Sequence, residues 1–155
     1  HMQRKKNPAY GNQLRKGRMS LPNHIYHITT TTFARKPVFK DLFLAREVVK
    51  CLYHPQRTAE TLAYVVMPDH LHWLLALGEQ GDMSSEVRIV KSFTTHRVNE
   101  IKGEYGSIWQ PGYYDHAIRK DEDLRRVARY IVANPIRAGI ADDIGQYSLW
   151  DAVWL

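Results

Sequence analysis

The hydrophobic and polar positions of this chain repeat with two periods, and the shorter period predicts strands. The run HIYHITTTT at 24–32 is rich in β-branched and aromatic residues, which a pleated surface favours, so we predict a first strand there. Residues 61–67 and 70–77 predict a second and a third strand, joined by a tight turn at Pro68-Asp69. We expect these two strands to pair as a hairpin.

Apolar side chains recur at helical spacing in the remaining long segments. We predict helices over 42–54, from Ser84 or Ser85 to about Lys102, and from an N-cap at Asp121 to near Asn134. Each helix is followed by a residue that ends helices, and these residues are Pro55, Gly103 and Pro135. A short fourth strand is predicted near 116–119, before the last helix.

The predicted order of strand, helix, strand, strand, helix, strand and helix is the split βαβ pattern. It predicts an α+β fold, a ferredoxin-like (RRM-like) sandwich in which an antiparallel four-stranded sheet carries its helices on one face. The open face of such a sheet commonly receives single-stranded nucleic acid. With 155 residues, 44% of them hydrophobic, the chain has the size of one domain. We assign a flexible basic arm to 3–20 and a single domain to 21–155, and interpret His1 and Met2 as the remnant of a tag.

The formal net charge is +6, and positive side chains gather before the first predicted strand, among them Arg15, Lys16 and Arg18. Such clustering favours a polyanionic partner, nucleic acid before a membrane surface, although a solubilising tail has the same composition. The single cysteine, Cys51, excludes an intrachain disulfide and favours a reducing compartment. No apolar run has the length of a membrane span and no signal peptide is visible, so we expect a soluble, cytoplasmic protein.

The third predicted strand carries the first candidate for chemistry. Side chains of a strand alternate between its faces, so His70 and His72 share one face. The opposite face carries Leu71, Trp73 and Leu75. Two neighbouring imidazoles can hold one divalent cation. The same pattern fits two surface histidines that bind nothing, so the motif by itself leaves metal binding open.

The last predicted helix carries the second candidate. Its apolar stripe includes Leu124, Ala128 and Ile131. Tyr130 and Asn134, spaced i to i+4, are neighbours at the edge of that stripe. A phenol and an amide at the border between core and solvent suit an active site. They equally suit a boundary tyrosine with a solvated hydroxyl and an asparagine that ends the helix.

Four motifs stand in an order and spacing that resemble a known family: GRMSLPNHIYHITTTTF, VVMPDHLHWLLAL, IWQPGYYDHAIR and YIVANPIRAGI. From Gly17 to about Trp150 the chain is similar to the REP-associated tyrosine transposases, relatives of the single-tyrosine insertion-sequence transposases of the HUH superfamily. The resemblance implies a ferredoxin-like fold of the HUH nuclease type. It also implies a metal-dependent DNA endonuclease and strand transferase that acts on hairpin-forming single-stranded DNA, such as REP-type palindromic elements, in association with the nucleoid.

The site residues of the family carry over at four positions. Its metal-binding histidines match His70 and His72, its nucleophilic tyrosine matches Tyr130, and its third metal ligand matches Asn134. The implied step is attack of Tyr130 on phosphorus, which gives a 5′-phosphotyrosine and a free 3′-hydroxyl without any nucleotide cofactor. Two imidazoles and an amide oxygen suit Mg²⁺ or Mn²⁺, and zinc is also compatible.

Other residues have expected supporting roles. Arg119 and Arg126 flank the candidate site in sequence, and with the three N-terminal cations they are expected to neutralise DNA phosphates. Trp109 and Tyr113 are candidates for stacking on unpaired bases, although aromatic residues beside a Pro-Gly loop equally often serve packing. Asp69 is expected to shape the turn before the histidines.

Two rival functions stay open at the level of sequence. The first is a module that binds hairpin DNA without cutting it. The second is a metal-dependent hydrolase in which water attacks and Tyr130 is incidental. The working form is expected to be a monomer or a homodimer.

Overall fold

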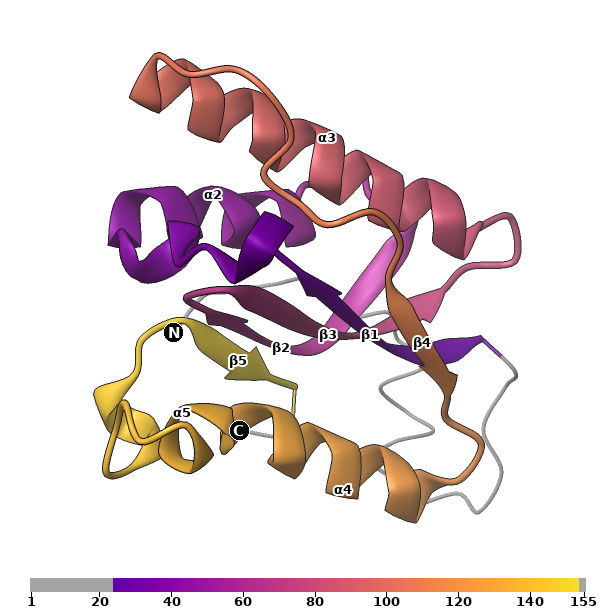
Figure 1. The fold of residues 1–155 in the computed structure, drawn as a ribbon. Helices are drawn as coiled ribbons and strands as arrows, with labels where there is room; N and C mark the ends of the chain where they lie inside the picture. Colours follow the sequence, from indigo (N-terminus) through magenta and orange to yellow (C-terminus); the bar gives the residue numbers. More distant parts are fainter. Residues whose placement is uncertain (1–23, 154–155) are drawn as a thin grey trace.

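The computed structural model describes residues 24–153, which form one antiparallel sheet with helices on both sides (Figure 1). The predicted basic arm over 3–20, with Arg15, Lys16 and Arg18, lies outside the described residues. Within 24–153, no helix combines the length and the apolar character needed to cross a membrane.

Within residues 24–153, five strands form the sheet in the order β4-β1-β3-β2-β5, and each neighbouring pair is antiparallel. Their bounds are β1 Ile25–Thr31, β2 Ala59–Met67, β3 His70–Leu77, β4 Tyr114–Ala117 and β5 Trp150–Ala152. The predicted hairpin is confirmed, because β2 and β3 pair around the Pro68-Asp69 turn with Met67 opposite His70. β3 lies in the middle of the sheet.

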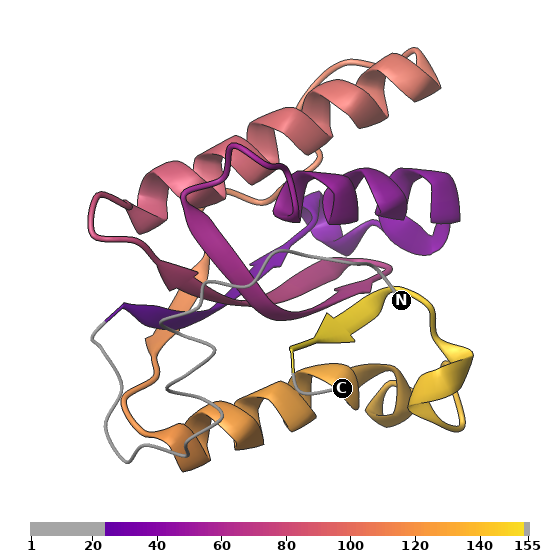
Figure 2. The ribbon, with the colours of Figure 1, turned by 180° about the vertical axis from the view of Figure 1, so that it is seen from behind.

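Two long helices cover one face of the sheet and a third lies on the other, as Figure 2 shows from behind. On the first face, α2 (Leu42–Leu52) and α3 (Met83–Lys102) pack against each other. On the second face, α4 (Asp121–Val132) packs mainly against β2, β5 and β3, and the short α5 (Asn134–Arg137) follows it. Three 3₁₀ turns complete the described elements: η1 Phe33–Arg35, η2 Val38–Lys40 and η3 Ile144–Gln146.

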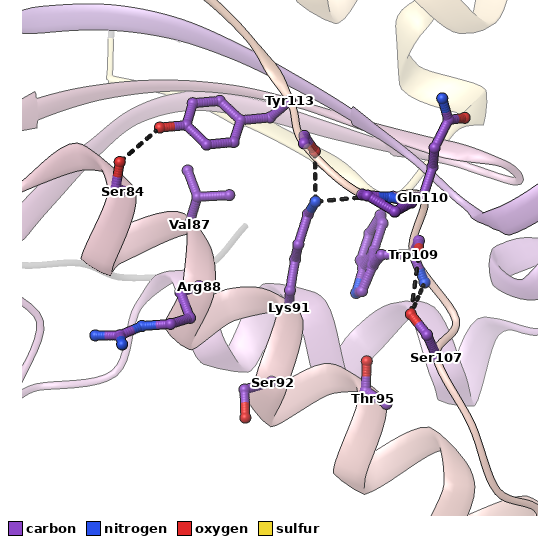
Figure 3. Close-up of a pocket in the computed structure, with 12 residues that line it drawn as sticks. Ser84, Val87, Arg88, Lys91, Ser92, Thr95, Ser107, Trp109, Gln110 and Tyr113 are labelled. Carbon is purple, nitrogen blue, oxygen red and sulfur yellow. Dashed lines mark hydrogen bonds between the residues drawn. The ribbon is translucent and has the colours of Figure 1, made fainter.

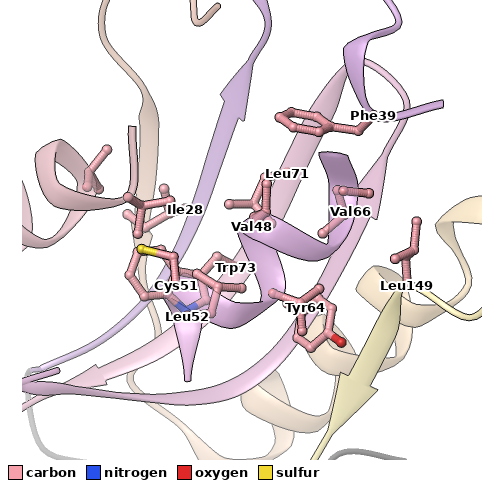
Figure 4. Packing of buried hydrophobic residues seen from close by; sticks show 14 of the residues in the cluster. Ile28, Phe39, Val48, Cys51, Leu52, Tyr64, Val66, Leu71, Trp73 and Leu149 are labelled. Carbon is pink, nitrogen blue, oxygen red and sulfur yellow. The ribbon is translucent and has the colours of Figure 1, made fainter. Parts of the chain in front are cut away.

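The alternation of β3 divides the core into two layers. Leu71 and Trp73 point into the layer under α2 and α3 (Figure 4), and Leu75 belongs to the same layer. Leu74 and Ala76 point into the layer under α4. Each fully buried large apolar side chain contributes roughly 1.5–3 kcal/mol. The two histidines of β3 have the parity of Leu74 and therefore lie on the α4 side.

The predicted architecture is wrong in two respects. The sheet has five strands rather than four, because β5 pairs with the outer edge of β2. A strand of three residues carries too little period-2 pattern to be recognised in the sequence. Helices also cover both faces rather than one. Because α4 has an apolar stripe and the sheet face beneath it carries Ala63 and Val65, both surfaces are buried only when they meet.

Helix ends follow the predicted signals with shifts of one or two residues. Gly103 ends α3 with φ 66°, the left-handed conformation that glycine adopts easily. The predicted N-cap at Asp121 is wrong, because Asp121 is already the first residue of α4 and Lys120 holds the cap position. Pro135 ends the long helix as expected. It then stands in the first turn of α5, where the missing N–H has no helical partner to lose.

A buried ion pair ties α3 to the start of β2. The carboxylate of Glu86 accepts hydrogen bonds from Nη2 of Arg57 at 2.8 Å and from the backbone N–H of Ala59 at 3.0 Å. Both charged side chains are almost completely buried. Each charge therefore depends on its partner, since neither can be solvated.

We expect Glu86→Ala to lower the free energy of unfolding by ~3–5 kcal/mol, because it leaves Arg57 and the N–H of Ala59 buried without a partner. Urea denaturation followed by circular dichroism measures this loss. Glu104→Ala is the matched control, since its ion pair with Lys102 at 3.6 Å is exposed and should contribute less than ~1 kcal/mol. Equal losses in the two variants would contradict the assignment.

Candidate active site

Two histidines and a tyrosine meet where α4 crosses β3. The rings of His70 and His72 lie edge to face, with 4.9 Å between their centroids. The ring of Tyr130, in the last turn of α4, lies edge to face against His72 with 6.0 Å between centroids. His72 is 8% exposed and Tyr130 is 50% exposed. The fold thus brings the three predicted side chains together, with the phenol on the accessible side.

His70 is oriented by the carboxylate that precedes it. Its Nδ1 lies 2.8 Å from Oδ1 of Asp69, and Oδ2 of Asp69 accepts a 3.0 Å hydrogen bond from Nε of Arg35. Burial acts to raise the pKa of Asp69, but the hydrogen bonds from His70 and Arg35 outweigh it and lower the pKa below its ordinary value. An ionised Asp69 accepts the Nδ1 proton of His70. In the neutral tautomer that this hydrogen bond favours, the lone pair is on Nε2.

His72 is held through its Nδ1 by strand β1. Nε2 of His27 and Oγ1 of Thr29 each lie 3.0 Å from this atom. Thr29 stands directly opposite His72 in the register of β1 and β3, and His27 comes two residues earlier on the same face. Both groups can accept the Nδ1 proton of His72. Neither Nε2 atom, of His70 or of His72, hydrogen-bonds to another described residue.

Burial keeps His27 and His72 neutral. It lowers the pKa of His72 to about 3, with added repulsion from His27, His70 and Arg137. Burial and the neighbouring His116 lower the pKa of His27 to about 4. Neutral imidazole is the form that binds metal ions, so these rings keep their lone pairs well below neutral pH.

Arg137 covers the other side of the phenol. Its guanidinium carbon lies 3.7 Å from the centroid of the Tyr130 ring, and its Nη2 donates a 2.6 Å hydrogen bond to the backbone oxygen of Tyr130. A cation this close to an aromatic face is attracted by the ring quadrupole. Contacts with Arg137 and His72 therefore define the position of the ring.

Asn134 stands one turn beyond Tyr130, as the first residue of α5. It is half-buried, and its side chain makes no hydrogen bond to another described residue. Over residues 24–153, no three His, Cys, Asp or Glu side chains form a group that could hold a metal ion. A cation here would need a third ligand of another type. By donor type, two imidazole nitrogens and an amide oxygen suit a divalent ion that keeps positions open for further ligands.

The two predicted DNA-contacting arginines within the described residues are both exposed. Arg126 stands one turn before Tyr130 on α4, and its Nη2 lies 2.7 Å from Oδ1 of Asp123. Arg119 lies between β4 and α4.

Two residues of the cluster were missed in the sequence. His27 and Thr29 share a face of the first predicted strand, which was the available signal, but only the register of β1 places them beside His72.

Comparisons with known proteins show the family to which the chain belongs. The sequence model of the family described as "Transposase IS200 like" matches residues 20–134, a range that includes both histidines, Tyr130 and Asn134. A REP-associated tyrosine transposase of Escherichia coli (strain K12) is 37% identical over 93 residues, which cover 59% of this chain and 53% of that protein. A related protein of Haemophilus influenzae is 30% identical over 102 residues, 59% of this chain and 56% of its own length. The chain thus spans about half the length of the curated relatives it matches.

Solved structures give the same result at the level of the fold. The structure of a REP-associated tyrosine transposase bound to a REP hairpin matches with a TM-score of 0.70 and 27% identity, over 86% of this chain and 79% of that one. A crystal structure of a Deinococcus radiodurans R1 protein matches with a TM-score of 0.53 and 22% identity, over 74% of this chain and 93% of that one. The second match supports the fold alone.

We expect the fold to lose stability as the pH falls from about 6.5 towards 4. The unfolded chain protonates His27 and His72 near their ordinary pKa of 6.5, whereas the folded chain keeps them neutral down to about 4 and about 3. Unfolding in this window takes up protons, so acid favours the unfolded state. Urea denaturation between pH 7 and 4.5 measures the slope of stability against pH.

His27→Gln should reduce the proton uptake of that transition by about one, while the glutamine still offers His72 a hydrogen-bond acceptor. His54→Gln is the matched control for the loss of one imidazole, because His54 is exposed. An unchanged slope in His27→Gln would show that His27 is not held neutral in the folded state.

Proposed function

Because the chain belongs to the IS200-like transposase family, we propose that it is a metal-dependent DNA endonuclease and strand transferase with Tyr130 as its nucleophile. Its proposed substrate is single-stranded DNA that folds into a hairpin, of the kind found in REP-type palindromic elements. The relatives support this choice, since one is a REP-associated tyrosine transposase and a similar solved structure holds a REP hairpin.

The observation that carries the proposal is the contact between Tyr130 and His72, with 6.0 Å between ring centroids. A nucleophile and a cation that act on one phosphate must lie side by side. Tyr130 stands on a helix rather than a loop, which holds its position relative to the sheet. Its half-exposed ring leaves room for a strand of DNA to approach.

The proposed reaction exchanges one phosphate ester for another. Oη of Tyr130 attacks the scissile phosphorus, the new bond to the phenolic oxygen forms, and the bond to the 3′ oxygen breaks. The phenol loses a proton and the leaving 3′ oxygen gains one, so protons balance. The 5′-phosphotyrosine keeps the energy of the original ester, so the reverse attack by a 3′-hydroxyl needs no nucleotide cofactor.

A divalent ion, Mg²⁺ or Mn²⁺, would supply Lewis-acid stabilisation of the charge on the phosphate oxygens. Nε2 of His70, Nε2 of His72 and the amide oxygen of Asn134 would hold it. Hydrogen bonds at the two Nδ1 atoms, between His70 and Asp69 and between His72 and both His27 and Thr29, keep these rings oriented without the ion.

Exposed arginines supply the expected contacts to the DNA backbone. Arg126 precedes Tyr130 by one helical turn, and Arg119 lies between β4 and α4. We assign both to phosphate contacts, together with Arg15, Lys16 and Arg18 of the basic arm. Such contacts provide most of the affinity and position the strand without reading its bases.

We expect Tyr130→Phe to abolish covalent attachment to DNA. A hairpin oligonucleotide labelled at its 3′ end should form an adduct with the unmodified protein that survives denaturing gel electrophoresis. Tyr130→Phe should form none, because it lacks the attacking oxygen, and its hairpin affinity should change by no more than about threefold because phosphate contacts remain. Tyr105→Phe, an exposed tyrosine outside the site, is the control.

Each other result identifies a different function. An adduct formed by Tyr130→Phe would refute the nucleophile. Cleavage without any adduct would favour attack by water, and hairpin binding without cleavage would favour a module that only recognises DNA.

We expect His70→Ala, or an excess of chelator, to stop cleavage while weakening hairpin binding less than about tenfold, because basic side chains rather than the ion provide most of the affinity. Electron paramagnetic resonance of Mn²⁺ titrated with protein should show binding to the unmodified chain and much weaker binding to His70→Ala. His96→Ala, an exposed histidine on α3, is the control. Equal losses of cleavage and of hairpin affinity would contradict this division between metal and basic surface.

A further inference from the structure

The loop before β4 packs two aromatic side chains, Trp109 and Tyr113, whereas Tyr114, the first residue of β4, is exposed. Trp109 is buried, and its Nε1–H donates to Oγ1 of Thr94 at 2.9 Å. Oη of Tyr113 lies 3.0 Å from Oγ of Ser84 on α3 (Figure 3). Of the alternatives open for Trp109 and Tyr113, packing therefore applies to both. The adjacent Tyr114 is 81% exposed.

The loop that presents Tyr114 is held in place from both sides. Nζ of Lys91 donates to the carbonyl oxygen of Gln110 at 2.9 Å and to that of Gly112, as Figure 3 shows. The backbone N–H of Gln110 donates to the carbonyl oxygen of Thr31 at 2.9 Å. The start of β4 is thereby fixed relative to α3 and β1, so Tyr114 has a defined position.

The register of the sheet places Tyr114 in one row with the candidate active site. Tyr114 is the partner of Thr29, and Thr29 is the partner of His72. Directly paired residues point to the same face, so Tyr114 lies on the side of the sheet that carries the imidazoles. Strands are spaced by about 4.8 Å, which separates Tyr114 from His72 by roughly 10 Å. That distance is about three nucleotides of a stacked strand.

Tyr114, Thr29 and His72 form a row across the sheet, and α4, the helix on this face, packs away from Tyr114. α4 packs mainly against β2, β5 and β3, whereas β4 is the opposite edge strand of the sheet. Tyr114, a large aromatic residue that is 81% exposed at this edge, packs little against the described residues. It has what base stacking requires, a free π face beside the path of a nucleic-acid strand.

We propose that Tyr114 is the stacking platform for one unpaired base of the DNA strand that carries the scissile phosphate. The inference rests on the proposed function and adds a subsite to it, within about three nucleotides of the phosphate at His72. Stacking accepts any base, so this contact sets the path of the strand across β4 and β1 rather than its sequence.

The test uses Tyr114→Val and Tyr114→Phe in a Tyr130→Phe background, in which the DNA stays intact. Valine suits a strand but has no aromatic face, whereas phenylalanine keeps the face. Fluorescence anisotropy measures affinity for a hairpin with single-stranded flanks. Tyr114→Val should weaken binding roughly 5- to 100-fold and Tyr114→Phe no more than about twofold. Tyr105→Val is the matched control, since Tyr105 is 99% exposed in the loop after α3 and should show no change.

A scan of abasic positions along the flanks identifies the base that stacks. One abasic position should weaken binding to the protein that has Tyr114 and have no further effect on Tyr114→Val, because both changes remove the same contact. The dependence of affinity on salt should be the same in both proteins, since no phosphate contact is lost. A phosphate-binding role for the hydroxyl of this tyrosine would instead make Tyr114→Phe lose as much affinity as Tyr114→Val.

The outcomes distinguish a failure of the Tyr114 proposal from a failure of the proposed function on which it rests. If the parent protein binds the hairpin and Tyr114→Val binds it equally tightly, or the abasic penalty persists in Tyr114→Val, the platform is refuted and the proposed function stands. If the parent protein does not bind hairpin DNA, both fail. Tyr114→Thr replaces the valine variant if that protein does not fold.

Discussion

The pleat of one central strand is the constraint on which the rest of this structure depends. β3 directs Leu71, Trp73 and Leu75 into the core under α2 and α3, and it directs His70 and His72 to the opposite face. A shift of register by one residue would move the apolar set to the α4 face and turn the histidines into the core under α2 and α3, so the core holds the strand in place. The interactions that stabilise the fold therefore also fix the spacing of the two imidazoles.

The position of α4 on the second face joins the phenol to these imidazoles. Its buried stripe, with Leu124 and Ile131, packs on the apolar part of the face, and Tyr130 lies at the border of that contact. If α4 lay beside α2 and α3, the sheet would separate Tyr130 from His72. Because α4 covers β2, β5 and β3 rather than β4, it also leaves the β4 edge of this face uncovered.

Hydrogen bonding makes the polar cluster compatible with burial. An imidazole buried without partners would destabilise the fold, and here Asp69 satisfies Nδ1 of His70 while His27 and Thr29 satisfy Nδ1 of His72. The Nε2 atoms of His70 and His72 then carry lone pairs. These two nitrogens are therefore suited to act as metal ligands rather than as proton donors. The lowered pKa values of His27 and His72 are the cost of this arrangement, since each ring loses the hydration that would stabilise its charged form.

The sequence by itself determined the paired strands β2 and β3, the helices α2 and α3, and the face shared by His70 and His72, because the periodicity of a half-buried segment is a local property. It also singled out Tyr130 and Asn134, although their helical spacing fitted an ordinary boundary position equally well. Only the tertiary structure decided that α4 crosses to the second face, that β5 extends the sheet, and that Thr29 lies between His72 and Tyr114. These features depend on register and packing between segments that are distant in the sequence. Thr29 and His72, for example, are 43 positions apart, and no local pattern encodes their contact.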